Sequence, residues 1–220
     1  MLTKDPKQVV IDKLTNSDPQ MKREERGILA KPESIVFLKE KDHQYNHAYI
    51  VQYMSTTNQQ WYETSYVVQN TDGSFVYRTG VSSKAEDRFL APKGTQPQLI
   101  ISAGGGKPAI QTIAQEEPIR GKKVQERIEG NVIKQTLKIG SQSIHYKPAG
   151  DVSDYRFLAG YLTTNGQDVT SVRMIPRVGS IEEDEVRDNT ILFLSEWSQP
   201  ITFEFYNPSH ALIATQFWDV

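Results

Sequence analysis

The stretch from His47 to Gly80 places the strongest constraint on what this chain can fold into. It contains three runs rich in β-branched and aromatic residues, which are the residue types that favour strands. Asp72-Gly73 separates the second run from the third, and glycine supplies the positive φ that a tight hairpin turn needs. Three such runs joined by short turns predict an antiparallel β meander.

Side chains alternate between the two faces of a strand, so each run divides into two sets. In the first run Tyr49, Val51 and Tyr53 share one face, and Ala48 and Ile50 share the other. The second run divides in the same way, with Trp61, Glu63, Ser65 and Val67 on one face and Tyr62, Thr64, Tyr66 and Val68 on the other. The pattern leaves open which of these aromatic side chains are core and which are surface.

The length of 220 residues fits one large or two small domains, and we expect two. Asp5-Pro6 is a good start for a short N-terminal helix, and a second short helix is expected over residues 20–26. The glycine-rich stretch from Ala103 to Pro108 is the best candidate for a boundary. We therefore predict an N-terminal helical segment plus meander over residues 1–106, and a β-sandwich-like module over residues 107–220.

The second half contains further strand patterns and turn signals. Gly130-Asn131 predicts a turn after a strand that starts near Val124, and a helix over residues 122–137 is the alternative. Asn165-Gly166 predicts a hairpin between the runs at 155–162 and 168–175. Residues 190–197, 201–206 and 211–218 are expected to be strands, and the acidic stretch 180–187 is expected to be a link or a single helical turn. The fold class is therefore mainly β, a β-rich α+β fold with two antiparallel modules and short N-terminal helices.

The last third of the chain has the pattern FLAGYL, NG, VTSVRMI, DNTILFLSE and ITFEFYNPSHALIA. It is loosely similar to the accessory β modules of exported or envelope-attached bacterial proteins. This resemblance implies an extracytoplasmic bacterial location if a leader has been removed, and a cytoplasmic location is the alternative. The sequence as printed has no signal-peptide pattern and no apolar run long enough to cross a bilayer.

The composition excludes several classes of chemistry. The chain has no cysteine, so thiolate nucleophiles, disulfides and iron–sulfur clusters are impossible. The formal net charge is -2, and without a basic excess we expect no nucleic-acid partner. No cofactor-binding or catalytic motif is present, so no cofactor and no metal are expected.

Four local patterns partly resemble known sites, and a structural interpretation is favoured for each. His43 and His47 fall near a strand, where residues four apart lie about 13 Å from each other, too far to share a metal. The glycines at 104–106 lack the Ser/Thr of a phosphate loop, and Gly140 to His145 lacks the Gly-x-Ser-x-Gly of a nucleophile elbow. The acids between Glu182 and Asp188 lack the spacing of a calcium loop and suggest a solvated charged loop.

The aromatic residues of the meander are the remaining candidates for binding. Rings on an open face of the sheet would form a platform for a protein or polysaccharide partner, whereas rings between layers would be core and cross-strand pairs. The candidate binding residues are Tyr49, Tyr53, Trp61, Tyr62, Tyr66 and Tyr77.

Two functional hypotheses follow from the sequence. The first is a non-catalytic β-rich binding or scaffold protein that recognises a protein or polymer partner. The alternative is a small-molecule-binding cavity protein or a hydrolase whose site is assembled only in the fold, from Glu63, His47 or Asp72. The oligomeric state is not predicted.

Overall fold

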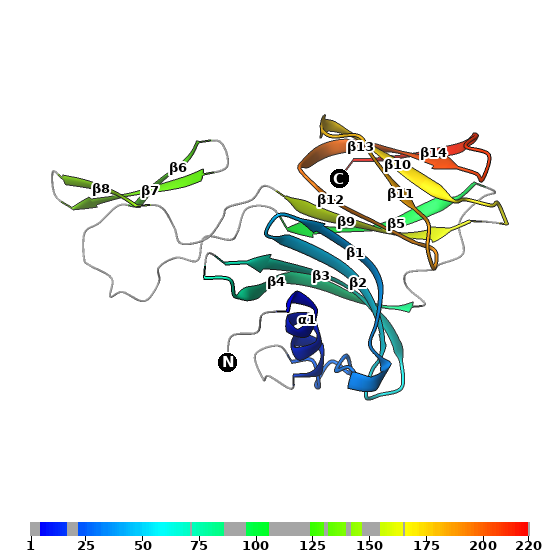
Figure 1. Ribbon diagram of the computed structural model, residues 1–220, viewed down its shortest axis with the longest axis horizontal. Coiled ribbons are helices and arrows are strands. Elements are labelled where there is room, and N and C mark those ends of the chain that lie inside the picture. The colour runs from blue at the N-terminus through cyan, green and yellow to red at the C-terminus, as the bar shows by residue number, and fades with distance from the viewer. Residues whose placement is uncertain are drawn as a thin grey trace.

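The computed structural model of this chain describes residues 5–16, 22–70, 72–85, 96–105, 124–129, 132–139, 142–146, 155–164 and 166–219. These residues form one α-helix, a single 3-10 turn (Pro32–Ser34) and antiparallel strands arranged in four sheets (Figure 1). The mainly β fold class predicted from the sequence is therefore confirmed. None of the described helices is long and apolar enough to cross a membrane.

The predicted meander is present as a four-stranded sheet, called the meander sheet below. Its strands are β1 (Val36–His43), β2 (Asn46–Met54), β3 (Gln60–Gln69) and β4 (Phe75–Lys84), in the order β1-β2-β3-β4. Asp72 caps the β3–β4 turn, because its carboxylate accepts the backbone N–H of Ser74 at 2.9 Å, and Gly73 has a φ of 81°. The turn chemistry seen in the sequence thus sets the register of this hairpin.

The N-terminal helix α1 (Pro6–Thr15) covers one face of the meander sheet. Asp5 caps it by accepting the backbone N–H of Lys7 at 2.9 Å, and Pro6 occupies the first turn. Val10 and Leu14 of the helix are fully buried against the sheet, in a core that includes Tyr49 and Tyr53. The second helix expected over residues 20–26 is not formed in its described part, since residues 22–27 are a turn that ends at Gly27 with a φ of 66°.

Two further sheets are stacked on the other face of the meander sheet (Figure 1). The middle sheet has the order β12-β9-β5 and contains β5 (Gln98–Gly105), β9 (Arg156–Thr163) and β12 (Thr190–Ser195). The outer sheet has the order β11-β10-β13-β14 and contains β10 (Ser171–Gly179), β11 (Glu182–Glu185), β13 (Trp197–Tyr206) and β14 (Leu212–Trp218).

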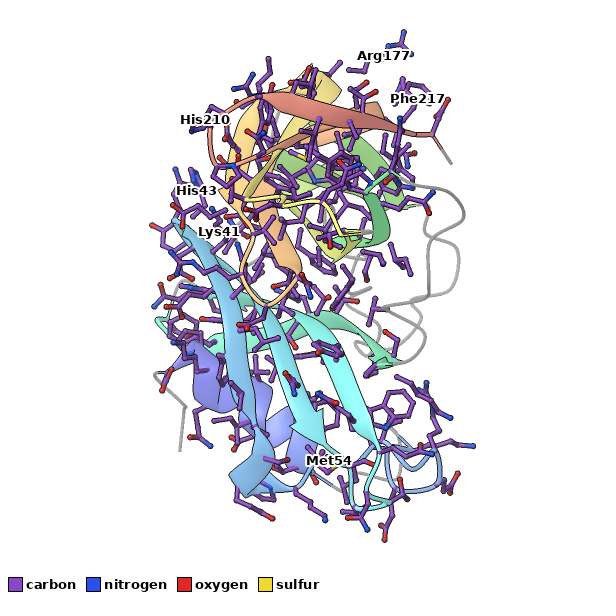
Figure 2. All side chains as sticks on the ribbon, turned by 90° about the vertical axis from the view of Figure 1, so that its right-hand side faces the viewer. Lys41, His43, Met54, Arg177, His210 and Phe217 are labelled. Carbon is purple, nitrogen blue, oxygen red and sulfur yellow. The ribbon has the colours of Figure 1, made fainter. Side chains whose placement is uncertain are left out.

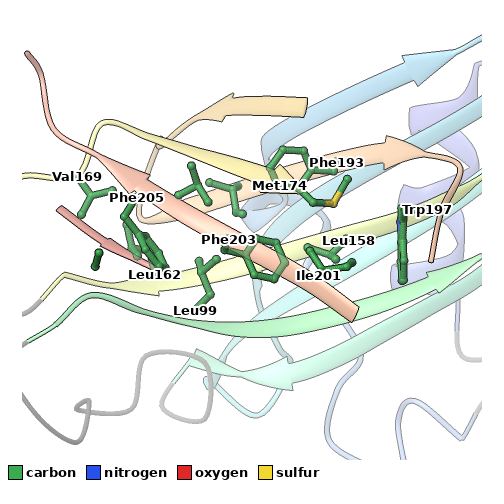
Figure 3. Close-up of a cluster of buried hydrophobic side chains, with 13 residues drawn as sticks. Leu99, Leu158, Leu162, Val169, Met174, Phe193, Trp197, Ile201, Phe203 and Phe205 are labelled. Carbon is green, nitrogen blue, oxygen red and sulfur yellow. The ribbon is translucent and has the colours of Figure 1, made fainter. Parts of the chain in front are cut away.

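The middle sheet is buried on both faces. Along β9, Phe157, Ala159 and Tyr161 pack towards the meander sheet, whereas Leu158 and Leu162 pack towards the outer sheet. The core between the middle and outer sheets contains Phe193, Phe203 and Phe205 (Figure 3). Burial on two faces explains why β9 and β12 are apolar along almost their whole length rather than alternating.

Among the described residues, three further strands pair only with one another and with no strand of the stacked sheets. β6 (Val124–Glu129), β7 (Val132–Ile139) and β8 (Gln142–Tyr146) pair with one another as an antiparallel sheet in the order β6-β7-β8. The predicted turn residues Gly130 and Asn131 between β6 and β7 lie outside the described residues.

Two local predictions for the second half are wrong. The runs on either side of residues 165–166 do not form a hairpin, because β9 belongs to the middle sheet and β10 to the outer sheet. Gly166 does adopt a turn conformation with a φ of 78°, and Asn165 lies outside the described residues. The acidic stretch 182–185 is not a link but strand β11, paired with β10.

The predicted division at residue 106 stays a prediction. β5 precedes that position and pairs along its length with β9, which follows it. Residues 106–108 of the glycine-rich stretch lie outside the described part of the chain.

Candidate functional site

A basic pocket lies where helix α1, the turn at residues 22–28 and strand β4 meet. Its volume is about 530 Å³. The lining residues come from these three segments and are Lys13, Arg23, Arg26, Ile28, Tyr77, Arg78, Gly80, Val81 and Ser82. Among the described lining residues four are cationic and none is acidic, so the described lining carries only positive charge.

Three of the four cations are not neutralised by the rest of the described chain. Lys13 and Arg78 are half-buried and Arg26 is exposed. Their side chains make no hydrogen bond or ion pair with any described residue. Cations that line one pocket without ion-pair partners create a local positive potential that attracts an anion.

The fourth cation, Arg23, is bound to a buried carboxylate. Its Nη2 donates to Glu63 Oε1 at 2.8 Å and its Nη1 donates to Oε2 at 3.4 Å. The side chains are only 4% and 0% exposed, respectively. Burial alone lowers the pKa of Arg23, but the charge and hydrogen bond of Glu63 outweigh it and raise the pKa overall.

Glu63 is fully occupied by donors. The Tyr77 hydroxyl donates to Oε1 at 2.5 Å, and the Ser82 hydroxyl donates to Oε2. Burial, followed by the charge of Glu63, raises the pKa of Tyr77 well above its ordinary value and raises the pKa of Tyr53 to about 12. Both hydroxyls therefore stay protonated at neutral pH, and Tyr77 serves as a donor to the carboxylate.

A β-bulge in β4 brings this part of the strand to the pocket. Thr79 pairs with Tyr66 and Tyr77 pairs with Val67, so Arg78 is an extra residue without a partner across the ladder. Two positions later, a Cβ on Gly80 would overlap the Tyr77 hydroxyl and lie 2.6 Å from Glu63 Oε1. Gly80 therefore permits the close approach of Tyr77 to Glu63.

The aromatic residues proposed from the sequence lie mostly inside the protein. Five of the six are at most 9% exposed and belong to hydrophobic cores. Tyr49, Tyr53 and Trp61 pack beneath helix α1, and Tyr62 and Tyr66 pack against the middle sheet. These positions favour the core interpretation, whereas Tyr77 is the member of the set that lines the basic pocket.

The histidine pair and the possible acid–base set are not brought together. Nε2 of His43 lies 2.7 Å from the Tyr155 hydroxyl, and Nδ1 of His47 lies 2.7 Å from an Asp42 oxygen. Glu63 and His47 have no partner in common, and Asp72 bonds only within its own turn. Among the described residues, no three His, Asp or Glu side chains are grouped as a metal site would require.

The acidic stretch takes part in structural ion pairs, and part of the Gly140 to His145 segment lies outside the described residues. Asp184 of the acidic stretch is buried and pairs with Lys39, while Glu183 pairs with Arg173. Gly140 and Ser141 lie outside the described residues, and residues 142–145 belong to β8.

Sequence reasoning missed the cations of the basic pocket. The charged run at residues 20–26 was visible, but it resembles any solvated surface segment. One signal was available in β3, where Glu63 is the charged residue on a strand face shared with Trp61, Ser65 and Val67. A charge on a face that carries large apolar side chains indicates a buried partner, and here that partner is Arg23. No family model, curated protein or solved structure matches this chain.

Proposed function

We propose that this protein is a non-catalytic binding protein that recognises an anionic group of a protein or polymer partner in the basic pocket. The observation that supports the proposal is the charge imbalance there. Lys13, Arg26 and Arg78 have no counter-charge among the described residues, whereas Glu63, the nearby carboxylate, is already neutralised by Arg23.

The geometry favours a bound anion over a merely solvated basic surface. Lys13 and Arg78 are half-buried, so their charges are less screened by water than those of a fully exposed side chain. Hydrogen bonds from cationic groups to an anion are roughly twice as strong as neutral ones. An anionic group seated in the pocket would supply the counter-charge that these donors lack among the described residues.

The same geometry argues against Glu63 as a general base. A general base must reach the proton that it removes, and each oxygen of Glu63 already accepts from two donors. The carboxylate is also 0% exposed and does not line the pocket. These facts support binding rather than hydrolysis at this position.

The proposal is compatible with the expectation of no nucleic-acid partner. A protein that follows a nucleic-acid backbone needs a long basic surface, whereas here the unpaired cations gather at one pocket on a chain with net charge -2. Recognition of a single anionic group needs only such a local cluster.

The test compares retention of the full chain on immobilised polyanions and on neutral dextran. Polyglutamate, dextran sulfate and polyphosphate are suitable probes. We expect retention on at least one polyanion, and the double variant Arg26→Gln with Arg78→Gln should bind at least about ten-fold more weakly, because each lost charged donor is worth about 1.5–3 kcal/mol.

A matched control separates the pocket from overall charge. The double variant Arg177→Gln with Arg187→Gln removes the same charge from exposed positions on the outer sheet and the segment after β11 (Figure 2 shows Arg177). We expect the control variant to be retained as strongly as the wild-type protein. An equal loss in both variants, or no retention of the wild-type protein on any polyanion, would contradict the proposal.

A further inference from the structure

We infer that the basic pocket is built for a tetrahedral oxyanion, a phosphate or sulfate ester group, rather than for a carboxylate. The inference rests on the proposed function and specifies the chemistry of the group that is bound. It depends on the origin of the three free cations and on the lining of the pocket.

The free cations come from three separate elements. Lys13 belongs to helix α1, Arg26 to the turn after it, and Arg78 to the bulge of β4. A carboxylate has two oxygens in one plane, and a single guanidinium can satisfy both. A tetrahedral oxyanion presents three oxygens in different directions and carries up to two negative charges, so it can use donors that approach from three sides.

Arg23 in the pocket wall can report a bound anion. Glu63 accepts from Nη1 and Nη2 of Arg23. The Nε atom is buried, and the Arg23 side chain also interacts with the Tyr53 hydroxyl in the core, so the Nε–H is not a group that a ligand reaches. Because Arg23 lines the pocket together with the free cations, its Nε–H resonance is sensitive to a charge placed among them.

The remaining lining indicates that the oxyanion is part of a larger ligand. A volume of about 530 Å³ is far more than a single phosphate or sulfate group fills. Val81 is half-buried and provides an apolar contact that a free inorganic ion could not use. An ester of a sugar or of a polymer unit would place its charged group among the cations and its carbon skeleton against Val81.

The experiment follows the arginine Nε–H resonances by ¹H–¹⁵N NMR while inorganic phosphate, sulfate or acetate is added at constant ionic strength. We expect phosphate or sulfate to shift the Arg23 Nε–H signal and to bind at least about ten-fold more tightly than acetate. Tighter binding of phosphate than of sulfate identifies a phosphate ester, and the opposite order identifies a sulfate ester. Arg26→Gln with Arg78→Gln should abolish the shift, and Arg177→Gln with Arg187→Gln should leave it unchanged.

The possible failures distinguish this inference from the proposed function. Acetate binding as tightly as phosphate and sulfate, or pocket-dependent retention on polyglutamate but not on dextran sulfate or polyphosphate, overturns the inference and leaves an anion-binding pocket in place. A phosphate- or sulfate-induced shift that survives the Arg26→Gln, Arg78→Gln substitutions places the ion elsewhere and also overturns it. Circular dichroism of each variant checks that the fold is intact.

Discussion

At the scale of single residues, the contact between Arg23 and Glu63 fixes how much positive charge the pocket retains. Both side chains are buried, and each compensates the charge of the other. Tyr77 and Ser82 complete the shell of the carboxylate, so the pair does not depend on water. Such a pair contributes little net stability compared with apolar residues, but it is costly to break because one partner keeps an uncompensated buried charge.

This asymmetry predicts the effect of Glu63→Gln. The substitution should lower the free energy of unfolding by about 3–5 kcal/mol, because Arg23 stays charged without its partner. The double variant Arg23→Met with Glu63→Gln should recover much of that loss, since it removes both charges and keeps an amide oxygen that can accept from Tyr77. Urea unfolding of the three proteins measures the difference. A Glu63→Gln protein that unfolds like the wild type would mean that the pair is not buried.

At the scale of elements, the sequence predicted the meander but not the pocket beside it. Period-two alternation is a local property, so the two faces of β2 and β3 could be assigned correctly from sequence alone. The bulge at Arg78 leaves no such mark, because one extra residue changes the register without changing the residue types. Arg23 likewise meets Glu63 across 40 positions, a contact that only the fold creates.

The hairpin expected at residues 165–166 shows a second limit. A glycine turn can join two strands of one sheet or carry the chain from one sheet to the next, and the local residues are compatible with both. Here β9 and β10 lie in adjacent layers, because β9 pairs instead with β5 and β12. The apolar character of both faces of β9 was the clue that it belongs to a fully covered sheet.

Tight packing of that covered sheet gives a prediction for Gly160 in β9. A Cβ at this position would lie 2.6 Å from Cγ1 of Ile191 and 2.9 Å from a methyl carbon of Leu99. Gly160→Ala should therefore lower the free energy of unfolding by about 1–3 kcal/mol through overpacking. Ile191→Ala completes a double-mutant cycle with Gly160→Ala. It removes the nearest atoms, so it should lower the free energy of unfolding less in the Gly160→Ala background than in the wild type. Additive effects in this double-mutant cycle would contradict the packing described here.

At the scale of the whole molecule, one carboxylate joins all three stacked sheets. Asp184 of β11 accepts from Lys39 of β1 at 2.5 Å and from Lys41 at 3.0 Å. It also accepts the backbone N–H of Leu192 in β12 at 2.8 Å. Burial lowers the pKa of Lys39, and Asp184 opposes that effect. Figure 2 shows Lys41 and His43 at the end of β1 that lies nearest the outer sheet.

The shared cores and the Asp184 contacts predict that the three stacked sheets unfold together. Loss of the meander sheet or of the outer sheet would expose one apolar face of β9 and β12, at about 25 cal/mol for each Å² of apolar surface. Neither layer can therefore separate without a large penalty to the middle sheet. This expectation bears directly on the division at residue 106, which predicts two modules that could unfold separately.

The three tryptophans allow the test. Trp197→Phe with Trp218→Phe leaves Trp61 as the reporter of the meander sheet, and Trp61→Phe leaves the Trp197–Trp218 pair as the reporter of the outer sheet. In each variant, urea transitions followed by tryptophan fluorescence and by far-ultraviolet circular dichroism should coincide, as a single cooperative unit requires. If the midpoint of the fluorescence transition in either variant differs from the midpoint of the dichroism transition, the sheets are separable. The middle sheet then does not couple its neighbours, and the division at residue 106 gains support.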